Sequence, residues 1–410
     1  MATDPKPSLP PKASAESSSW PAEVEHALSA GLGDCSLREL LSLLLSSVGH
    51  AERQAFLERR HDDHANGFYD RSLQVGAIPV EVQVPRTRSG EFRPVSLPPP
   101  YQRGYPAETQ ALLLSLLASA RSVNAAKQAL EKLGLARSQQ ELERVAMGLI
   151  EELELRNTRP IDPDLLALFL DAKYVEFRDG DRLRSAAIYV VLGLRRDGRK
   201  QVLACLPRAG RENLEDWKLV LRSLIERGLR RVLILVHDDF SGLLPITQGL
   251  FPTSDVQLCT VHLQRNAKTH LSKSDAAEFQ QRWRAIKASW NLEVSQQQFE
   301  QLCDRFAKSY PSFIVEVRKK RPHYLAFIAY PDAVRRSFCT TNAVEAVNGQ
   351  LEILRRNSGG YFQSQESLKL KLGLVVSGLE QQRWRSPGRS FSAAVPQLNT
   401  MFQARFETAA

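Results

Sequence analysis

RVLILVHDD, at residues 231–239, is an almost continuous apolar run that ends in two aspartates. Runs of this kind are typical of a strand that is buried on both faces of a sheet. Three more apolar runs precede it, namely LLALFLDAKYVEF (165–177), SAAIYVVLGL (185–194) and QVLACLP (201–207). The last two are joined by RRDGRK, whose Asp-Gly pair predicts an antiparallel hairpin. The centre of the chain is therefore predicted to form a sheet.

Predicted helices alternate with the later strands of this sheet. The stretch NLEDWKLVLRSLIERG (213–228) has helical spacing and closes on Gly228, a residue type that commonly ends helices. A short helix is expected at GLLPITQGLF and a further strand at VQLCTVH (256–262). Three strands with antiparallel turns, then helix, strand, helix and strand, is the order of a ribonuclease-H-like core. The predicted fold class is therefore α/β, with a ribonuclease-H-like mixed-sheet core.

Composition divides the rest of the chain. Residues 1–20 are rich in Pro, Ser and Ala and are expected to be a disordered tail. Residues 21–75 are predicted to be helical, with a turn-rich loop at HDDHANGFYD (61–70), and residues 76–106 a basic ribbon and linker. A helix-turn-helix-like DNA-binding domain is predicted at 107–157, although a plain three-helix bundle fits the pattern equally well. The core is assigned to 158–262 and 331–385, with an all-helical insertion at 263–330 and a C-terminal tail at 386–410.

Charge and apolar patterning narrow the class of protein. The 410 residues include 55 Lys and Arg against 46 Asp and Glu, so the net charge of +9 favours a polyanionic partner. The apolar runs fall far short of the roughly 20 residues that a membrane-spanning helix needs. No apolar signal core follows Met1, and the five scattered cysteines fit a reducing compartment. We therefore expect a cytoplasmic protein with no membrane partner.

Two aspartates interrupt the predicted strands. Asp171 lies within FLDAKY and Asp238 ends LVHDD, and a carboxylate inside a buried strand is costly unless it is paired or binds a metal. Both strands are expected to be central and adjacent. A third acid on a later helix would complete an oxygen-ligand site for Mg²⁺, and Glu345 is the candidate, with Asn348 one turn on. The alternatives are acids satisfied by backbone donors or an arginine, and an acid favoured at a helix N-terminus.

Four stretches, in this order, resemble bacterial transposases of the Mutator type, which are insertion-sequence DDE enzymes. They are VPRTRSGEFRP (84–94), DWKLVLRSLIERGLRRVLILVHDDFSGL (216–243), FPTSDVQLCTVHLQRN (251–266) and TTNAVEAVNGQLEILRR (340–356). The similarity runs from about residue 75 to 385. The resemblance implies metal-dependent DNA strand cleavage at terminal inverted repeats, followed by strand transfer. It also implies that Asp171, Asp238 and Glu345 are catalytic and hold two Mg²⁺ ions, for which Mn²⁺ can substitute.

The sequence departs from the family pattern next to the second acid. Asp239 stands where the family usually has Gly, and His237 stands where a small residue is usual. The pattern selects Asp238 as the ligand, whereas chemistry alone would allow Asp239. A catalytically decayed or domesticated copy that acts as a sequence-specific DNA-binding protein therefore stays open as an alternative, as does a structure-selective nuclease of the same fold.

Further residues are candidates for DNA binding or for support of the site. Cys259 and His262 form a Cys-x-x-His pair, for which the resemblance favours a structural or substrate-positioning role over zinc, because no second ligand pair is evident. The tryptophans Trp283, Trp290 and Trp384 are either packing residues or base-stacking residues. The remaining candidates are Arg265, Asn266, Thr341, Asn342, Asn348, Arg355, Arg356, Arg86 and Arg88, together with the basic run at 318–321.

The expected partner is DNA, comprising the terminal inverted repeats and the target. Several basic runs would have to lie against phosphates in such a complex. Because two ends must be joined, the resemblance implies at least a homodimer on DNA. It places the protein in the cytoplasm, associated with the nucleoid.

Overall fold

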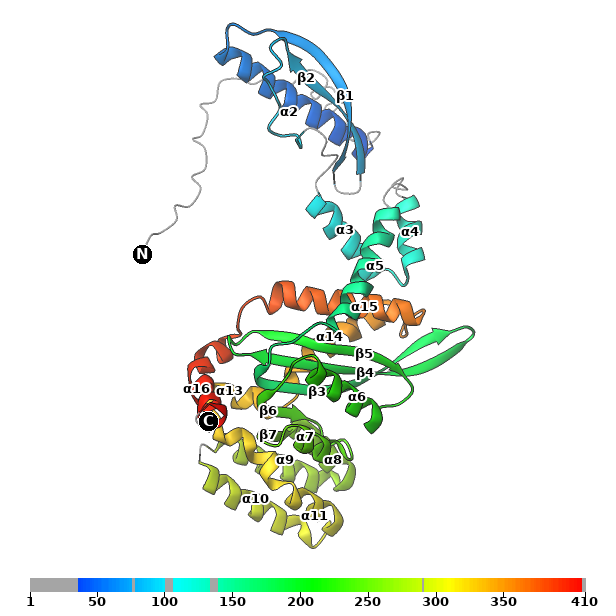
Figure 1. Cartoon of the computed structure of the whole chain (residues 1–410). Helices are drawn as coiled ribbons and strands as arrows, with labels where there is room; N and C mark the ends of the chain where they lie inside the picture. Colours follow the sequence, from blue (N-terminus) through cyan, green and yellow to red (C-terminus); the bar gives the residue numbers. More distant parts are fainter. Residues whose placement is uncertain (1–35, 76–77, 100–105, 133–138, 290, 408–410) are drawn as a thin grey trace. The chain divides into compact units, whose positions relative to one another are not determined.

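The computed structural model describes residues 36–75, 78–99, 106–132, 139–289 and 291–407 (Figure 1). The predicted tail at 1–20 lies outside these residues. The chain divides into two compact units: residues 1–113 with 133–138, and residues 114–132 with 139–410. No helix in the described ranges combines the length and apolar character needed to cross a membrane.

The first unit packs one helix on a two-stranded antiparallel ribbon. Helix α2 (Leu37–Arg59) begins with a capping box in which Ser36 and Glu39 bond each other's backbone. Strands β1 (Ala65–Val75) and β2 (Ile78–Thr87) pair in antiparallel fashion. Alternate residues of β2 point inward and, with residues of β1 and α2, form a small apolar core of Leu73, Val80, Val82, Val84 and Leu97 with Leu41 and Leu45.

The prediction for residues 61–75 was wrong. The sequence predicts helix for 21–75 with a polar loop at 61–70, whereas Ala65–Val75 is strand β1. Most of this strand is exposed, and Phe68 and Tyr69 are both more than 40% exposed. A strand with so little buried surface carries no apolar alternation, so its state is set by pairing with β2 rather than by its own residues.

A five-stranded mixed sheet forms the centre of the second unit, with the order β5-β4-β3-β6-β7. Strands β3 (Asp164–Asp179), β4 (Arg182–Arg195) and β5 (Lys200–Ala209) form an antiparallel meander, which confirms the predicted Asp-Gly hairpin. Strands β6 (Arg231–His237) and β7 (Asp255–Leu258) run parallel to β3. The last strand is shorter than predicted, because Cys259 already caps helix α8. A mixed α/β fold is therefore confirmed.

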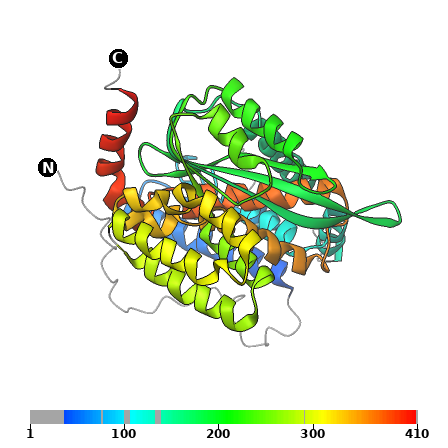
Figure 2. The ribbon, with the colours of Figure 1, turned by 90° about the horizontal axis from the view of Figure 1, so that it is seen from below.

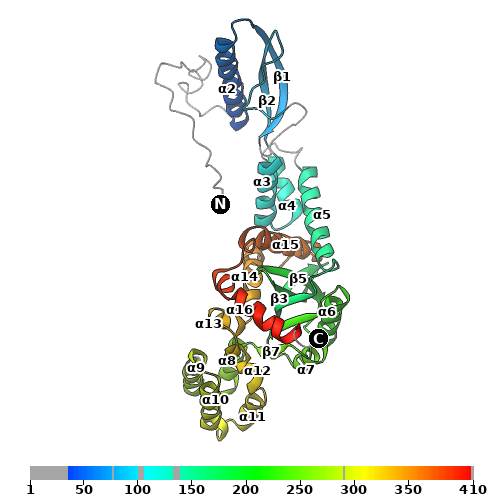
Figure 3. The ribbon, with the colours of Figure 1, turned by 60° about the vertical axis from the view of Figure 1, so that its left-hand side comes forward.

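Helices cover both faces of this sheet (Figure 3). One face packs against α14 (Asn342–Asn357) and α15 (Gln365–Gly378), and the other against α6 (Leu214–Glu226) and α7 (Leu243–Leu250). Trp217 of α6 is fully buried in the second layer, as its helical spacing predicts. The sheet is thus enclosed, which explains its nearly continuous apolar strands.

Residues 107–157 are largely helical, as predicted. They contain α3 (Pro106–Ser119), α4 (Val123–Lys132) and α5 (Gln139–Arg156). Helix α5 packs against α15. The buried ammonium of Lys371, on α15, donates to the carbonyl oxygens of Leu117, Ala118 and Ala120, which ties the end of α3 to α15.

A helical segment separates β7 from α14 (Figures 1 and 2). It comprises α8 (Thr260–His270), α9 (Lys273–Ala288), α10 (Leu292–Ala307), α11 (Pro311–Lys319), α12 (Arg321–Leu325), the 3₁₀ turn η3 (Ala326–Ala329) and α13 (Asp332–Phe338). Trp283 is fully buried there, edge-on to Phe299 and Tyr324, so it packs the core and is not free to stack on bases. Trp384 is also buried, and Trp290 lies outside the described residues.

The end of the chain is a helix rather than the patternless tail that the sequence predicts at 386–410. After the π-helical turn η4 (Leu379–Arg383), α16 (Arg389–Phe406) buries Phe391, Ala394, Leu398 and Phe402. These positions have helical spacing, but Pro396 lies inside the helix and weakens the signal. Packing against the sheet and α13 therefore decides the state of this segment.

Candidate active site

The register of β3 and β6 places two aspartates side by side. Phe169 pairs with Val236 in the parallel ladder, and Asp171 and Asp238 each lie two residues further along their strands. Because side chains alternate across a strand, the two carboxylates share one face of the sheet. Neighbouring strands are about 4.8 Å apart, so the two acids are neighbours.

Burial and mutual repulsion make this pair costly when both groups are charged. Asp171 is only 8% exposed, and its burial, followed by the charge of Asp238, raises the pKa of its carboxyl to about 7. Burial likewise raises the pKa of Asp238. The alternative of acids neutralised by an arginine does not apply, because neither carboxylate has an arginine or lysine partner among the described residues. A nearby cation would remove the cost.

Helix α14 lies over β3 and follows it in register. The amide of Asn348 donates to Asp171 Oδ2 at 2.7 Å. One turn later, Glu352 lies 3.5 Å from the ammonium of Lys173, two residues along the strand. Glu345 lies one turn before Asn348 on the same face, which puts it at the aspartate end of the helix.

The side chain of Glu345 is exposed and does not yet touch the aspartates. In the orientation that satisfies its hydrogen bonds, the Asn342 amide donates to both Glu345 carboxylate oxygens at 3.1 and 3.2 Å. The described residues contain no group of three His, Cys, Asp or Glu side chains close enough to hold a metal ion. The structure thus brings together two of the three predicted acids and places the third one helical turn from Asn348.

The structure separates the roles of Asp238 and Asp239. Both carboxylate oxygens of Asp239 accept hydrogen bonds from Lys320, at 2.8 and 2.7 Å, and the hydroxyl of Tyr324 donates to Oδ2. Asp239 therefore ties the end of β6 to the helical segment. His237 is fully buried, and its ring lies 3.1 Å from the Thr247 hydroxyl, so it packs beneath the strand end.

Cys259 and His262 stand at the start of α8, close to the aspartates. Cys259 Sγ is 3.7 Å from the hydroxyl of Thr341, the residue that precedes α14. The neighbouring Cys259 thiol is the main cause that raises the pKa of His262, and both aspartates raise it further. His262 in turn lowers the pKa of Asp171 and Asp238. The pair thus links α8 to α14 beside the acids.

Sequence reasoning missed Glu212. Its carboxylate accepts a 2.7 Å hydrogen bond from the indole of Trp217, and its charge raises the pKa of Asp171. Asp238 in turn raises the pKa of Glu212. The only signal in the sequence is an acid just before the helix cap Asn213, which is too common to single out.

The arginines and lysines predicted to contact DNA differ in whether their charge is already paired with an acid. Arg318 and Arg321 both pair with Glu300, and Lys320 pairs with Asp239, so the run at 318–321 is largely neutralised. Glu352 pairs with both Arg355 and Arg356. Arg265 lies 3.4 Å from His262 and Asn266 is exposed beside it. In the first unit, Arg86 and Arg88 are exposed on β2 and just beyond it, and Arg86 lies over the Tyr69 ring.

The donor set beside Asp171 suits a hard cation. The buried Asn348 Oδ1 has no hydrogen-bond partner in the part of the chain that the structure describes, although Nδ2 of the same amide holds Asp171. An unpartnered oxygen and two carboxylates are the ligand type that Mg²⁺ and Mn²⁺ prefer.

Known proteins resemble this chain over most of its length. The model of the family described as "Transposase, Mutator family" matches residues 17–386. The chain is 29% identical to the transposase for insertion sequence element ISRM3 of Rhizobium meliloti, covering 88% of this chain and 93% of the relative. It is 27% identical to the transposase for IS406 of Burkholderia multivorans, covering 82% and 89%.

A search of solved structures finds the Drosophila P element transposase strand transfer complex. The alignment covers 72% of this chain and 81% of that one, with 14% identity. Its TM-score of 0.28 is too low to establish a shared fold.

Proposed function

The chain belongs to the Mutator family of transposases, and we propose that it moves an insertion sequence by DDE chemistry at Asp171, Asp238 and Glu345. The observation that carries the proposal is the in-register pair of Asp171 and Asp238 beneath the start of α14. A ribonuclease-H-like core is part of the proposal. The sheet order supports it, as does the position of Asp171 within β3 and of Asp238 directly after the neighbouring strand β6.

Three acids would hold two Mg²⁺ or Mn²⁺ ions in this proposal. Asp171 and Asp238 would provide carboxylates from the sheet, and Glu345 would provide a third from α14. Two bound ions of this kind activate the attacking oxygen and stabilise the leaving 3′ oxygen in an in-line phosphoryl transfer. The attacking oxygen belongs to water during cleavage and to a DNA 3′-hydroxyl during strand transfer.

The other side chains of the site hold these acids in place. Asn348 fixes the rotamer of Asp171 through its 2.7 Å hydrogen bond. Asn342 holds Glu345 at the start of α14, within one turn of Asn348. The Cys259–Thr341 contact joins α8 to α14, which keeps the third acid over the sheet.

DNA is the proposed partner, as terminal inverted repeats and as target. We propose that the helices at 107–157, together with Arg86 and Arg88, contribute to end binding. Two chains would meet on the DNA because two ends must be joined. The cytoplasm, with association to the nucleoid, is the proposed location.

A strand-cleavage and strand-transfer assay tests the mechanism. Labelled DNA with the element's own ends is incubated with the full chain and Mg²⁺ or Mn²⁺. We expect Asp171→Asn, Asp238→Asn and Glu345→Gln each to lower the rate by at least about a hundredfold, because each removes a charged ligand. Asp179→Asn is the matched control, since this exposed acid on the same strand pairs only with Arg184.

A binding measurement separates loss of the ions from loss of the chemistry. A ligand that binds only the folded chain raises its melting temperature. Mg²⁺ or Mn²⁺ should stabilise the wild type and the Asp179→Asn control but not Asp238→Asn. Specific end binding without cleavage or metal response in the wild type would instead favour a decayed or domesticated copy.

A further inference from the structure

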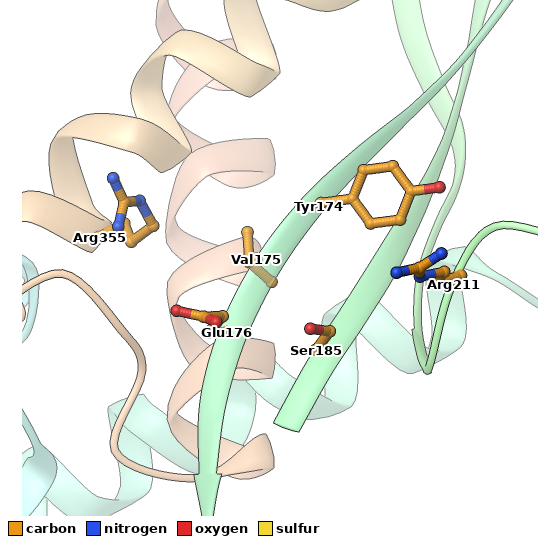
Figure 4. A pocket seen from close by; sticks show the side chains of 6 residues that line it. All are labelled: Tyr174, Val175, Glu176, Ser185, Arg211 and Arg355. Atoms are coloured by element: carbon orange, nitrogen blue, oxygen red, sulfur yellow. The ribbon is translucent and has the colours of Figure 1, made fainter. Parts of the chain in front are cut away.

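A pocket opens beside the paired aspartates. It has a volume of about 560 Å³ and is lined by Tyr174, Val175, Glu176, Ser185, Arg211 and Arg355. The Tyr174 ring and Arg211 lie toward one side of it, and Glu176 and Arg355 toward the other (Figure 4). The lining therefore combines an aromatic ring with two guanidinium groups.

The pocket follows the open edge of β3. Strand β6 pairs with β3 only from Asp164 to Phe169, and the next contact on that side is the bridge from Phe177 to Phe362. Asp171 stands at the start of this interval and Tyr174 within it. A strand rises about 3.3 Å per residue, so Tyr174 lies about 10 Å along β3 from Asp171, with its side chain on the opposite face of the strand.

The loop after β5 connects the pocket to the acids. Arg211 lines the pocket, and the charge of the next residue, Glu212, contributes to the raised pKa of Asp171 after the larger effects of burial and of Asp238. The guanidinium of Arg211 is exposed and has no hydrogen-bond or ion-pair partner within the described ranges. It is therefore free to bind a phosphate.

Arg355 differs from Arg211 because its charge is already in use. It forms a two-pronged pair with Glu352, donates to the carbonyl of Gly360, and feels the charge of Glu176 across the pocket. It shapes the far wall rather than offering a free cation. The electrostatic attraction for an anion comes from Arg211.

Tyr174 is held with its ring toward solvent. The side chain is 52% exposed, and its hydroxyl accepts a 3.3 Å hydrogen bond from the backbone N–H of Glu212. A fixed, exposed aromatic ring beside an arginine is the combination that binds nucleic-acid strands, through stacking and a phosphate contact. Isolated exposed tyrosines and arginines are common on surfaces, so the position beside the acids carries the argument.

We propose that this pocket holds one nucleotide of the DNA strand that is being cut, with its phosphate on Arg211 and its base or sugar on Tyr174. The inference rests on the proposed function, because the cut site defines where the strand begins. The distance of about 10 Å along β3 places the contact within a few nucleotides of the scissile phosphate.

Single-turnover cleavage by the full chain, over a range of DNA concentrations, tests this assignment. Arg211→Ala and Tyr174→Ala should each raise the DNA concentration at half-saturation about tenfold, with a smaller effect on the maximal rate. Tyr174→Phe keeps the ring and should stay within about twofold of the wild type. Arg222→Ala is the charge-matched control, because Arg222 is exposed on the neighbouring helix α6 and lies outside the pocket.

Shortened substrates locate the contact. Nucleotides are removed one at a time on either side of the scissile phosphate. The penalty of Arg211→Ala should disappear when one particular nucleotide near the scissile phosphate is missing, because wild type and variant then lack the same contact. A penalty that survives every truncation, or that Arg222→Ala matches, overturns the proposal.

The outcomes also separate the pocket from the mechanism. If the wild type cuts DNA and Arg211→Ala behaves like Arg222→Ala, the pocket assignment fails and the proposed function stands. If the wild type does not cut with either metal, the proposed function fails. The pocket is then judged by the affinity of the metal-free chain for the same truncated DNA ends, with the same variants.

Discussion

Asp238 and Asp239 are adjacent in the chain but have opposite electrostatic surroundings. Asp238 is buried, which raises the pKa of its carboxyl, and its charge raises the pKa of the neighbouring Asp171 after the larger effect of burial. Asp239 faces the ammonium of Lys320 and the hydroxyl of Tyr324, so its charge is compensated. The family's usual Gly at the second position has no side chain for such a tie.

Substitution of the two neighbours should change stability in opposite directions. Without added metal, Asp238→Asn should raise the free energy of unfolding because it removes repulsion. Asp239→Asn should lower it by about 1–2 kcal/mol because it leaves the partly exposed Lys320 without its partner. Urea denaturation followed by tryptophan fluorescence measures both changes. The double variant Asp239→Asn, Lys320→Met tests the pair directly. If it loses as much unfolding free energy as the two single variants together, the two side chains do not interact.

Part of the site could be predicted from the sequence. Asp171 lies within the apolar strand β3, and Asp238 directly follows the apolar strand β6. Both strands are central in the sheet, and their register brings the two acids side by side. Helical spacing also puts Asn348 and Glu345 on one face of α14. The tie between Asp239 and Lys320 spans 81 residues, and no local pattern encodes such a contact.

Lys371 shows how a single element can be anchored by one buried charge. Lys371 is 1% exposed, and its ammonium caps the C-terminal end of α3 by donating hydrogen bonds to three carbonyl oxygens. Lys371→Met keeps the volume but leaves those carbonyls unsatisfied, so it should lower the free energy of unfolding by about 2–3 kcal/mol. Chemical denaturation checks this value, and Lys369→Met, an exposed neighbour paired with Glu154, is the control.

The same lysine gives a pH dependence of known sign. Burial lowers the pKa of Lys371 to about 8, from 10.5 in an unfolded chain. Between these values the unfolded chain binds more protons at this site, so its contribution to stability rises with pH. The gap in unfolding free energy between wild type and Lys371→Met should therefore widen from pH 8 to 10.5. A constant gap would show that the lysine titrates normally.

The elements that the sequence missed share a physical cause. Strand β1 is mostly exposed and takes its state from pairing with β2, and α16 takes its state from packing despite Pro396. The central strands were predictable because burial on both faces demands long apolar runs. Local pattern thus identifies elements that are buried throughout, and tertiary contacts decide the others.

Charge is unevenly distributed over the whole molecule. Residues 36–99 contain eight basic and eight acidic residues, whereas residues 100–410 contain 45 basic and 33 acidic residues. The excess positive charge therefore belongs to the part of the chain that carries the sheet. Non-specific attraction to DNA should come mainly from that part.

The salt dependence of DNA binding tests whether the neutral first unit also contacts phosphates. Each phosphate contact contributes about 0.9 to the slope of log affinity against log salt concentration. The double variant Arg86→Ala, Arg88→Ala should lower this slope by about 2, measured by fluorescence anisotropy with DNA ends. The double variant of Arg38 and Arg59, exposed on α2, should leave it unchanged. An unchanged slope in the first variant would place Arg86 and Arg88 away from the DNA.

The helical segment between β7 and α14 also delays the synthesis of Glu345 relative to that of the two aspartates. Glu345 follows Asp238 by 107 residues. A ribosome adds about 5–20 residues per second, so both aspartates exist for about 5–20 s before the glutamate is made. On the proposed mechanism, a nascent or prematurely terminated chain that lacks α14 cannot break DNA, even where its earlier segments occupy the ends. Such fragments would compete with finished copies for the same ends, which limits how often the element moves.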